Sequence, residues 1–469
     1  MMKVSNTSKN SAILYFLLFI TSYLLICWAL LQEIEYIYTI NLVVDVVCLM
    51  IIIMLLAHYS QRNKFDIFDP LYFSSAIYLL MFFITPIYDI LMGNYEWYGY
   101  SLFRYGVKSS VIAFFGYIFM YVGYSVNFRL HEKVYPRNYV DTKNTFNPEI
   151  NQRIMLLVIY CMYIVSFLAN VFYLVNSGFG NFLYIITLGL LGTGNDNIAE
   201  SNIGFISMLS YSLPTIVLLV WEYSNKKVLK VLLFIPMFML QVARGYRFFI
   251  IQIVVTFVTY YYLKKQKRPS IKSIILLLTF LMFFVLVMTM FRTSISGGAG
   301  IDLSMITGET ISNALDAAIW ENLRIYQNVY GMIAVIPSKY PYVWLRQIFI
   351  GTLVMTIPRA LWPNKISSYG GEGLKVLIGR NIAAGQAYPT LGEYYYAFGI
   401  MGVIVFMAIY GKWLKKLKNK YMHSHDPLDL IYFSVLLGCC LQLIIRGYFP
   451  SNFWYLLFAV LPIWVVRLL

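Results

Sequence analysis

Residues 273–291 read SIILLLTFLMFFVLVMTMF, an unbroken apolar run that begins after Lys272 and ends before Arg292. A helix needs about 20 such residues to cross the hydrocarbon core of a bilayer. The rest of the chain follows this pattern, since 60% of its residues are hydrophobic and only 12% are charged, whereas a soluble domain carries about 25% charged residues. Continuous runs also exclude a membrane β-barrel, whose strands alternate in segments of about ten residues. The sequence therefore predicts an all-α, polytopic transmembrane protein and excludes a soluble enzyme.

Twelve apolar runs are candidate membrane spans, and the basic residues between them predict their direction. Lysine and arginine gather in the cytoplasmic connections of membrane proteins, and here clusters such as 264–272 and 412–420 follow alternate runs. We therefore expect both termini in the cytoplasm, and the net charge of +15 needs no nucleic-acid partner. The predicted spans are residues 11–31, 36–57, 70–92, 106–128, 154–176, 203–222, 229–243, 248–263, 273–291, 395–411, 428–445 and 453–466.

One long segment, residues 293–394, departs from the pattern of spans and short connections. It contains several glycines and most of the acidic residues that this topology places outside the membrane. Its apolar run 342–357 contains Arg346, and a single crossing there would reverse the direction of the basic cluster that follows. We expect one large extracytoplasmic domain with an interfacial or re-entrant helix near 342–357. It would separate nine spans within residues 1–292 from three within residues 395–469.

A tight hairpin at residues 229–263 carries the first candidate site. Two full spans need about 40 residues, so this shorter segment must turn sharply, at Ala243-Arg244-Gly245-Tyr246-Arg247. Arg244 and Arg247 would share one face of a helical turn, and two guanidinium groups can grip a diphosphate. The alternative is that both arginines reach lipid phosphates or pair with a buried acid. Ionisable groups at membrane depth are costly, which favours a functional role.

A second candidate is Glu393, in Pro389-Thr390-Leu391-Gly392-Glu393-Tyr394, where the chain is predicted to re-enter the membrane. A partly desolvated carboxylate there suits a general base that takes a proton from a sugar hydroxyl. The alternative is an acid that only stabilises a helix N-terminus. Tyr394 beside it offers an aromatic face for a sugar ring. Further cations predicted on the same side, as binding groups for an anionic ligand, are Arg292, Arg324, Arg359, Lys365 and Arg446.

The sequence contains no recognisable motif for binding a metal ion or a nucleotide. The four histidines, His58, His131, His423 and His425, all fall on the predicted cytoplasmic side. The five cysteines lie in apolar runs without metal-binding spacing. There is no phosphate-binding GxxxxGK[ST] motif and no HExxH motif. We therefore expect no metal and no cofactor.

With these features assembled, the chain resembles the bacterial polymerases that join the repeat units of O-antigen and capsule, the Wzy type. The resemblance covers most of the length, with about twelve spans and a large outer loop late in the chain. It depends on three blocks of sequence. These are Arg244-Gly245-Tyr246-Arg247, Ile357-Pro358-Arg359-Ala360-Leu361-Trp362-Pro363-Asn364-Lys365, and Pro389-Thr390-Leu391-Gly392-Glu393 with Phe398-Gly399 and Gly402.

The resemblance implies an inverting, metal-independent glycosyltransferase of the GT-C type in the bacterial cytoplasmic membrane, with its active site facing outward. Its donor and acceptor would be oligosaccharides linked to undecaprenyl diphosphate, with membrane lipids and a chain-length regulator as further partners. Diphosphate binding then maps onto Arg244, Arg247 and Arg359. Related ligases, which transfer the polysaccharide to another lipid, use an outer histidine that this topology lacks. A flippase for the same lipid remains a second alternative, although transporters usually show internal repeats.

Overall fold

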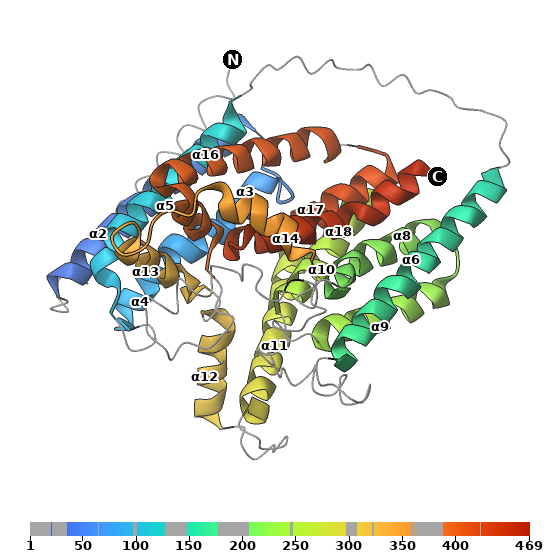
Figure 1. Cartoon of the computed structure of the whole chain (residues 1–469), viewed down its shortest axis with the longest axis horizontal. Coiled ribbons are helices and arrows are strands. Elements are labelled where there is room, and N and C mark those ends of the chain that lie inside the picture. Colours follow the sequence, from blue (N-terminus) through green and yellow to red (C-terminus); the bar gives the residue numbers. More distant parts are fainter. Residues whose placement is uncertain are drawn as a thin grey trace.

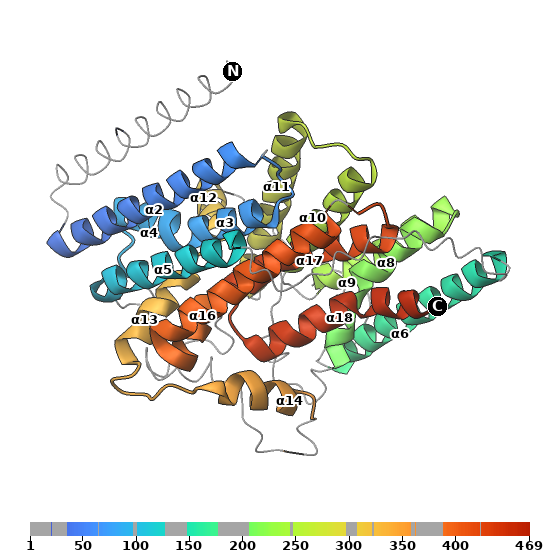
Figure 2. The ribbon, with the colours of Figure 1, turned by 90° about the horizontal axis from the view of Figure 1, so that it is seen from above.

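The computed structural model describes residues 20, 35–63, 65–96, 101–126, 148–176, 206–243, 247–296, 307–320, 323–357, 362, 388–422 and 424–469. Regular structure in these ranges is helical throughout. The longer helices run beside one another, as Figures 1 and 2 show from two directions. They are α2 (Tyr36–Arg62), α3 (Pro70–Leu79), α4 (Thr85–Leu91), α5 (Gly106–Ser125), α6 (Pro148–Asn176), α8 (Leu213–Tyr223), α9 (Lys227–Ala243), α10 (Arg247–Lys264), α11 (Ile271–Ser296), α12 (Gly308–Ile319), α13 (Gln327–Val335), α14 (Thr352–Met355), α16 (Thr390–Tyr421), α17 (Pro427–Ile445) and α18 (Phe449–Leu468).

The described parts of the predicted spans from 36–57 onward lie in helix, and 11–31 lies outside the described residues apart from residue 20. Seven of the described helical segments are long and apolar enough to cross a membrane, and shorter apolar helices occur at 248–264 and 271–286. The chain is therefore a polytopic α-helical membrane protein. The count of twelve spans and the cytoplasmic location of both termini stay predictions.

The buried side chains form two main cores. The first bundle consists of α2 to α5, α13 and α16, and the second consists of α6, α8 to α10, α17 and α18. In Figure 2 the two bundles lie on either side of the line along which α16 meets α17. α11 and α12 contact each other and project together from the bundles (Figure 1). The candidate site described below lies where the two bundles meet.

Two glycines allow the close crossing of α5 and α16, the most extensive contact between two helices in the described chain. A Cβ atom at Gly411 would lie 1.9 Å from the carbonyl oxygen of Met120, and one at Gly123 would lie 2.1 Å from that of Ala408. Small residues let helix backbones approach in this way within membranes. This crossing fixes α16 against the first bundle.

A break divides α16 near its start. Phe398 and Gly399 leave the helical conformation, with Gly399 at φ 65°, a region that favours glycine. The break frees the carbonyl groups of Tyr396 and Ala397, which accept hydrogen bonds from the backbone N–H groups of Val343 and Trp344 at 3.2 and 2.9 Å. The segment before α14 therefore completes the hydrogen bonding of the broken helix.

The predicted helix at 342–357 is present as a π-helical turn at Arg346–Gly351 followed by α14. It packs on α18, where the indole nitrogen of Trp454 donates to the carbonyl oxygen of Thr352 at 2.9 Å. Its interfacial position stays a prediction, as does a separate outer domain at 293–394. Within the described part of that segment, α13 packs in the first bundle, where Val329 and Tyr330 are buried.

Ion pairs join the helix ends at one face of the molecule. Lys418 near the end of α16 contacts Asp69, the N-cap of α3, at 2.6 Å. Asp69 also accepts a hydrogen bond from Tyr124 at 2.7 Å. These contacts place the predicted cytoplasmic ends of several helices together. The other pairs of this face are Lys264 with Glu222, Arg268 with Asp66, and Arg467 with Asp429.

Candidate active site

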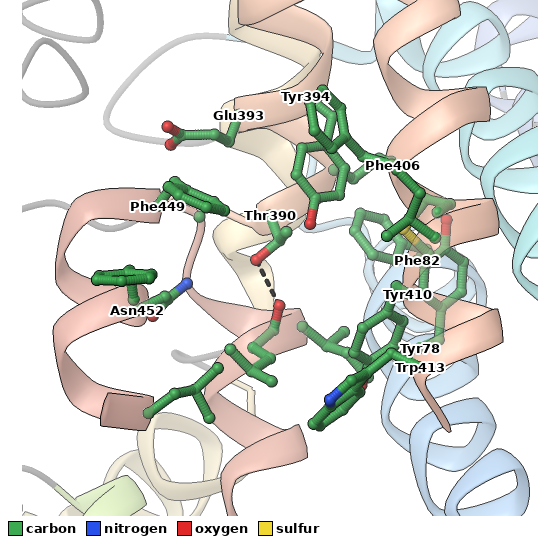
Figure 3. Close-up of a pocket in the computed structure, with 18 residues that line it drawn as sticks. Tyr78, Phe82, Thr390, Glu393, Tyr394, Phe406, Tyr410, Trp413, Phe449 and Asn452 are labelled. Carbon is green, nitrogen blue, oxygen red and sulfur yellow. Dashed lines mark hydrogen bonds between the residues drawn. The ribbon is translucent and has the colours of Figure 1, made fainter. Parts of the chain in front are cut away.

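A cavity of about 400 Å³ lies between α16, α17 and α18, with Tyr78 and Phe82 closing it from the first bundle (Figure 3). Its volume falls within the range of small-molecule sites, about 300–1,000 Å³. Most of its wall is apolar. Aromatic side chains supply much of that wall, namely Tyr78, Phe82, Tyr394, Phe406, Tyr410, Trp413, Phe449 and Phe453.

Glu393 lies at one end of this cavity, in the first turn of α16, with 2% of its surface exposed. Its carboxylate accepts a hydrogen bond of 2.7 Å from the Tyr388 hydroxyl and another from the backbone N–H of Phe449. In Figure 3 the carboxylate points away from Tyr394 and over Phe449, the first residue of α18. It is thus held at the N-terminal ends of two helices, where the helix dipoles favour negative charge.

The turn between α17 and α18 is fastened to the start of α16. The Thr390 hydroxyl donates to the carbonyl oxygens of Leu443 at 2.5 Å and Arg446 at 3.0 Å. The backbone N–H of Gly447 donates to the carbonyl oxygen of Tyr388 at 2.6 Å. A Cβ atom at Gly447 would lie 2.5 Å from the carbonyl oxygen of Pro389, so the close approach requires glycine. The positions of Glu393 and Arg446 are therefore fixed relative to each other by backbone contacts.

Arg446 connects this turn to the predicted arginine hairpin. Its guanidinium carbon lies 5.1 Å from the ring centre of Phe248, which is within the range of a cation–π contact. Phe248 follows Arg247 in the first turn of α10, and α10 packs along α17. The end of the hairpin thus reaches the same end of the molecule as Glu393. Arg244 and the side chain of Arg247 lie outside the described residues.

Arg324 has a different setting from the cavity residues. Its guanidinium contacts the carboxylates of Asp89 at 2.9 Å and Asp316 at 2.8 Å. Burial acts to lower the pKa of Arg324, but the hydrogen bonds and charges of these two acids outweigh it, and the pKa is raised. Two carboxylates already offset its charge, so an anionic ligand would have to compete with them.

Of the predicted site residues, Glu393 and Tyr394 line the cavity, and the backbone of Arg446 lies in the turn fastened to Thr390, with its guanidinium against Phe248. Arg324 contacts the end of α4 instead. The side chain of Arg292 lies outside the described part of the chain, as do Arg359 and Lys365 altogether.

Sequence reasoning missed Tyr388, Thr390 and Asn452 as parts of this site. Asn452 is 6% exposed and lines the cavity, and its side-chain oxygen has no hydrogen-bond partner among the described residues. Its amide nitrogen donates to the carbonyl oxygen of Arg446 at 2.6 Å. The signal available in the sequence was an asparagine inside the apolar run of α18. Within the described ranges, no three His, Cys, Asp or Glu side chains gather as metal ligands would.

A family model described as O-antigen polysaccharide polymerase Wzy matches residues 13–469, which is nearly the whole chain. No curated protein and no solved structure gives a match.

Proposed function

Since this chain belongs to the O-antigen polysaccharide polymerase Wzy family, we propose that Glu393 and the arginines near it carry out its glycosyl transfer at the outer face of the bacterial cytoplasmic membrane. The family polymerises lipid-linked repeat units. One observation supports this location most strongly. A buried carboxylate lies at the end of an apolar cavity between membrane helices, beside a turn that carries an arginine.

In the proposed reaction, a hydroxyl of the incoming unit attacks the anomeric carbon of the sugar that joins the growing chain to its lipid diphosphate. The bond from that carbon to the diphosphate oxygen breaks, and the carbon inverts. Glu393 takes the proton of the attacking hydroxyl as general base. The diphosphate leaves on its undecaprenyl lipid, and no metal is required.

The leaving diphosphate gains negative charge in this step, so arginines aimed at it stabilise the transition state. We assign this role to Arg244, Arg247 and Arg446, with Arg292, Arg359 and Lys365 as supporting cations. Tyr394 contributes to substrate binding at the cavity. We assign Arg324 to positioning the chain around α12, because its two carboxylate partners occupy its guanidinium.

The test is polymerisation by purified protein supplied with lipid-linked repeat unit. We expect the wild type to form a ladder of lipid-linked polymers, and Glu393→Gln to lower kcat by about 10²–10⁴-fold, the usual contribution of a general base. Glu309→Gln is the matched control, because Glu309 is an exposed acid of α12. Wild-type kcat in Glu393→Gln would overturn the assignment.

The same assay separates the alternatives. A ligase would transfer the oligosaccharide to a different lipid acceptor and form no ladder on the carrier. A flippase would form no glycosidic bond and would only move the lipid-linked unit across vesicle membranes.

A further inference from the structure

The cavity between α16, α17 and α18 has one polar end. Glu393, Thr390 and Asn452 lie there, and the Asn452 side-chain oxygen is buried without a partner among the described residues. Toward the other end, the wall consists of aliphatic and aromatic side chains as far as Trp413 (Figure 3). A ligand that fits this cavity therefore has a polar head and an apolar tail.

The cavity also runs in the direction of the membrane spans. Its lining residues on α16 extend from Thr390 to Trp413, across the break at Phe398 and Gly399, and the straight part after the break, residues 400–413, rises about 20 Å at 1.5 Å per residue. The hydrocarbon core of a bilayer is about 30 Å thick. A tail in this cavity would lie along the hydrocarbon chains of the surrounding lipid, with its head at the level of Glu393.

The cavity is open along one side. Ile409 and Phe453 line it and are 57% and 43% exposed, whereas Met407 and Tyr410 form its inner wall. A chain can therefore enter from the bilayer without passing through the cores of the bundles. A cavity of about 400 Å³ encloses part of a long chain, and the remainder would extend through this open side into the bilayer.

From these features, and relying on the function proposed above, we propose that this cavity holds the polyisoprenoid chain of the lipid-linked substrate and so sets its sugar–diphosphate bond beside Glu393. Arg446, in the turn between α17 and α18 that is fastened to Thr390, would contribute positive charge at the end where the diphosphate lies. The unpartnered oxygen of Asn452 accepts a hydrogen bond from a hydroxyl of the first sugar. The lipid carrier is thus bound along its chain as well as by its charged head.

A matched pair of leucines on α18 tests the proposal. Leu456 lines the cavity, and Leu461 lies farther along α18 outside the lining with 37% of its surface exposed. We expect Leu456→Trp to raise the KM for the full-length undecaprenyl substrate by about tenfold, equivalent to about 1.4 kcal/mol. A substrate analogue with a ten-carbon isoprenoid chain should be used equally by Leu456→Trp and wild type, and Leu461→Trp should match wild type with both.

An equal KM of Leu456→Trp and wild type for the full-length substrate would overturn the proposal while leaving the polymerase function intact. Absence of any ladder with wild-type protein would instead overturn the function. A second measurement uses wild-type protein alone, with a photoreactive polyisoprenoid diphosphate in phosphatidylethanolamine vesicles. We expect crosslinks to α16 and α18 that excess undecaprenyl diphosphate suppresses. Equal suppression by excess phosphatidylglycerol would show a general lipid groove and contradict the proposal.

Discussion

Arg324 joins two carboxylates of very different exposure. The side chain of Asp89 is fully buried, whereas that of Asp316 is 43% exposed. Tyr326 also donates to Asp89 at 3.0 Å, so the buried carboxylate is satisfied by residues that follow α12 in the chain. Stacking of Trp320 on Tyr88, with ring centres 4.0 Å apart, adds a second contact at the same place. The segment from α12 to α13 is thereby anchored to the end of α4.

Removal of the arginine should therefore destabilise the protein more than removal of its exposed partner, Asp316. We expect Arg324→Ala to lower the free energy of unfolding by about 3–5 kcal/mol, because it leaves the Asp89 charge buried and unpaired. Asp316→Asn should cost less than about 1 kcal/mol, as exposed pairs do. Thermal unfolding in detergent measures both. The double variant Arg324→Ala, Asp89→Asn should recover most of the loss, and its failure to do so would contradict the explanation.

For single residues, the sequence shows which side chains are charged, but it does not show which other side chains each of them contacts. Arg324 was grouped with the cations for an anionic ligand, while Asp89, its partner, lies 235 residues earlier in the chain. Only folding brings the two together. Glu393 was identifiable because it stands at the predicted edge of a span. Its partner Tyr388 is only five residues away, but the contact depends on the turn into α16.

Helix α16 carries Glu393, contains the break at Phe398 and Gly399, and makes the close crossing with α5. Its break at Phe398 and Gly399 separates the turns that carry Glu393 from the straight part that crosses α5. A Cβ atom at Gly399 would lie 2.9 Å from the Tyr342 hydroxyl. The break therefore depends on glycine both for its backbone conformation and for the close approach of the preceding segment.

Substitution of this glycine should have a larger effect than backbone strain alone. We expect Gly399→Ala to lower the free energy of unfolding by more than the strain cost of about 1–3 kcal/mol, because the added methyl group also meets Tyr342, and to lower polymerase activity, because Glu393 would shift. Gly93→Ala is the matched control, since Gly93 has φ 73° but no atom within 4 Å of an added Cβ. We expect Gly93→Ala to lower the free energy of unfolding and the polymerase activity less than Gly399→Ala does. Equal losses in the two variants would exclude a role for the Tyr342 contact.

The close crossing of α5 and α16 can also be tested by substituting a glycine. Gly411→Ala should destabilise the protein by about 1–3 kcal/mol or more, because an added methyl group must push the two backbones apart. Gly308→Ala, at the start of α12, meets nothing within 4 Å and should have little effect. Thermal unfolding of both variants gives the comparison, and a Gly411→Ala protein as stable as wild type would refute the close crossing.

The existence of these helices was predictable, because long apolar runs have few other structures available in a membrane. The two spans predicted at 229–243 and 248–263 coincide with α9 and α10, which are of 17 and 18 residues, while the tight hairpin between them stays a prediction because its apex lies outside the described residues. The break in α16 and the π-helical turn at Leu80–Ile84 were not predictable. The break in α16 is completed by the backbone N–H groups of Val343 and Trp344, which come from a separate segment of the chain.

For the whole molecule, the ion pairs at one face and the Glu393 region at the other support one consistent direction of the helices. The prediction is that single cysteines will react from opposite sides of the membrane. The cysteine of Lys267→Cys, which follows α10, should react with a membrane-impermeant maleimide only after the cells have been permeabilised. Ser338→Cys, after α13, should react in intact cells. Both side chains are exposed, and wild-type protein is the control for its native cysteines. Labelling of both positions from the outside would contradict the proposed orientation.

The open side of the cavity has a consequence for the rate of chain growth. Each transfer leaves one spent carrier at the site, and the next cycle requires its replacement by a loaded one. If the cavity holds the lipid carrier as proposed, the exposure of Ile409 and Phe453 along the opening lets this exchange take place by diffusion within the plane of the bilayer. The supply of substrate is then measured as carriers per area of membrane. Crowding and viscosity of the lipid, more than the volume of the surrounding solution, will set how fast polymer can be made.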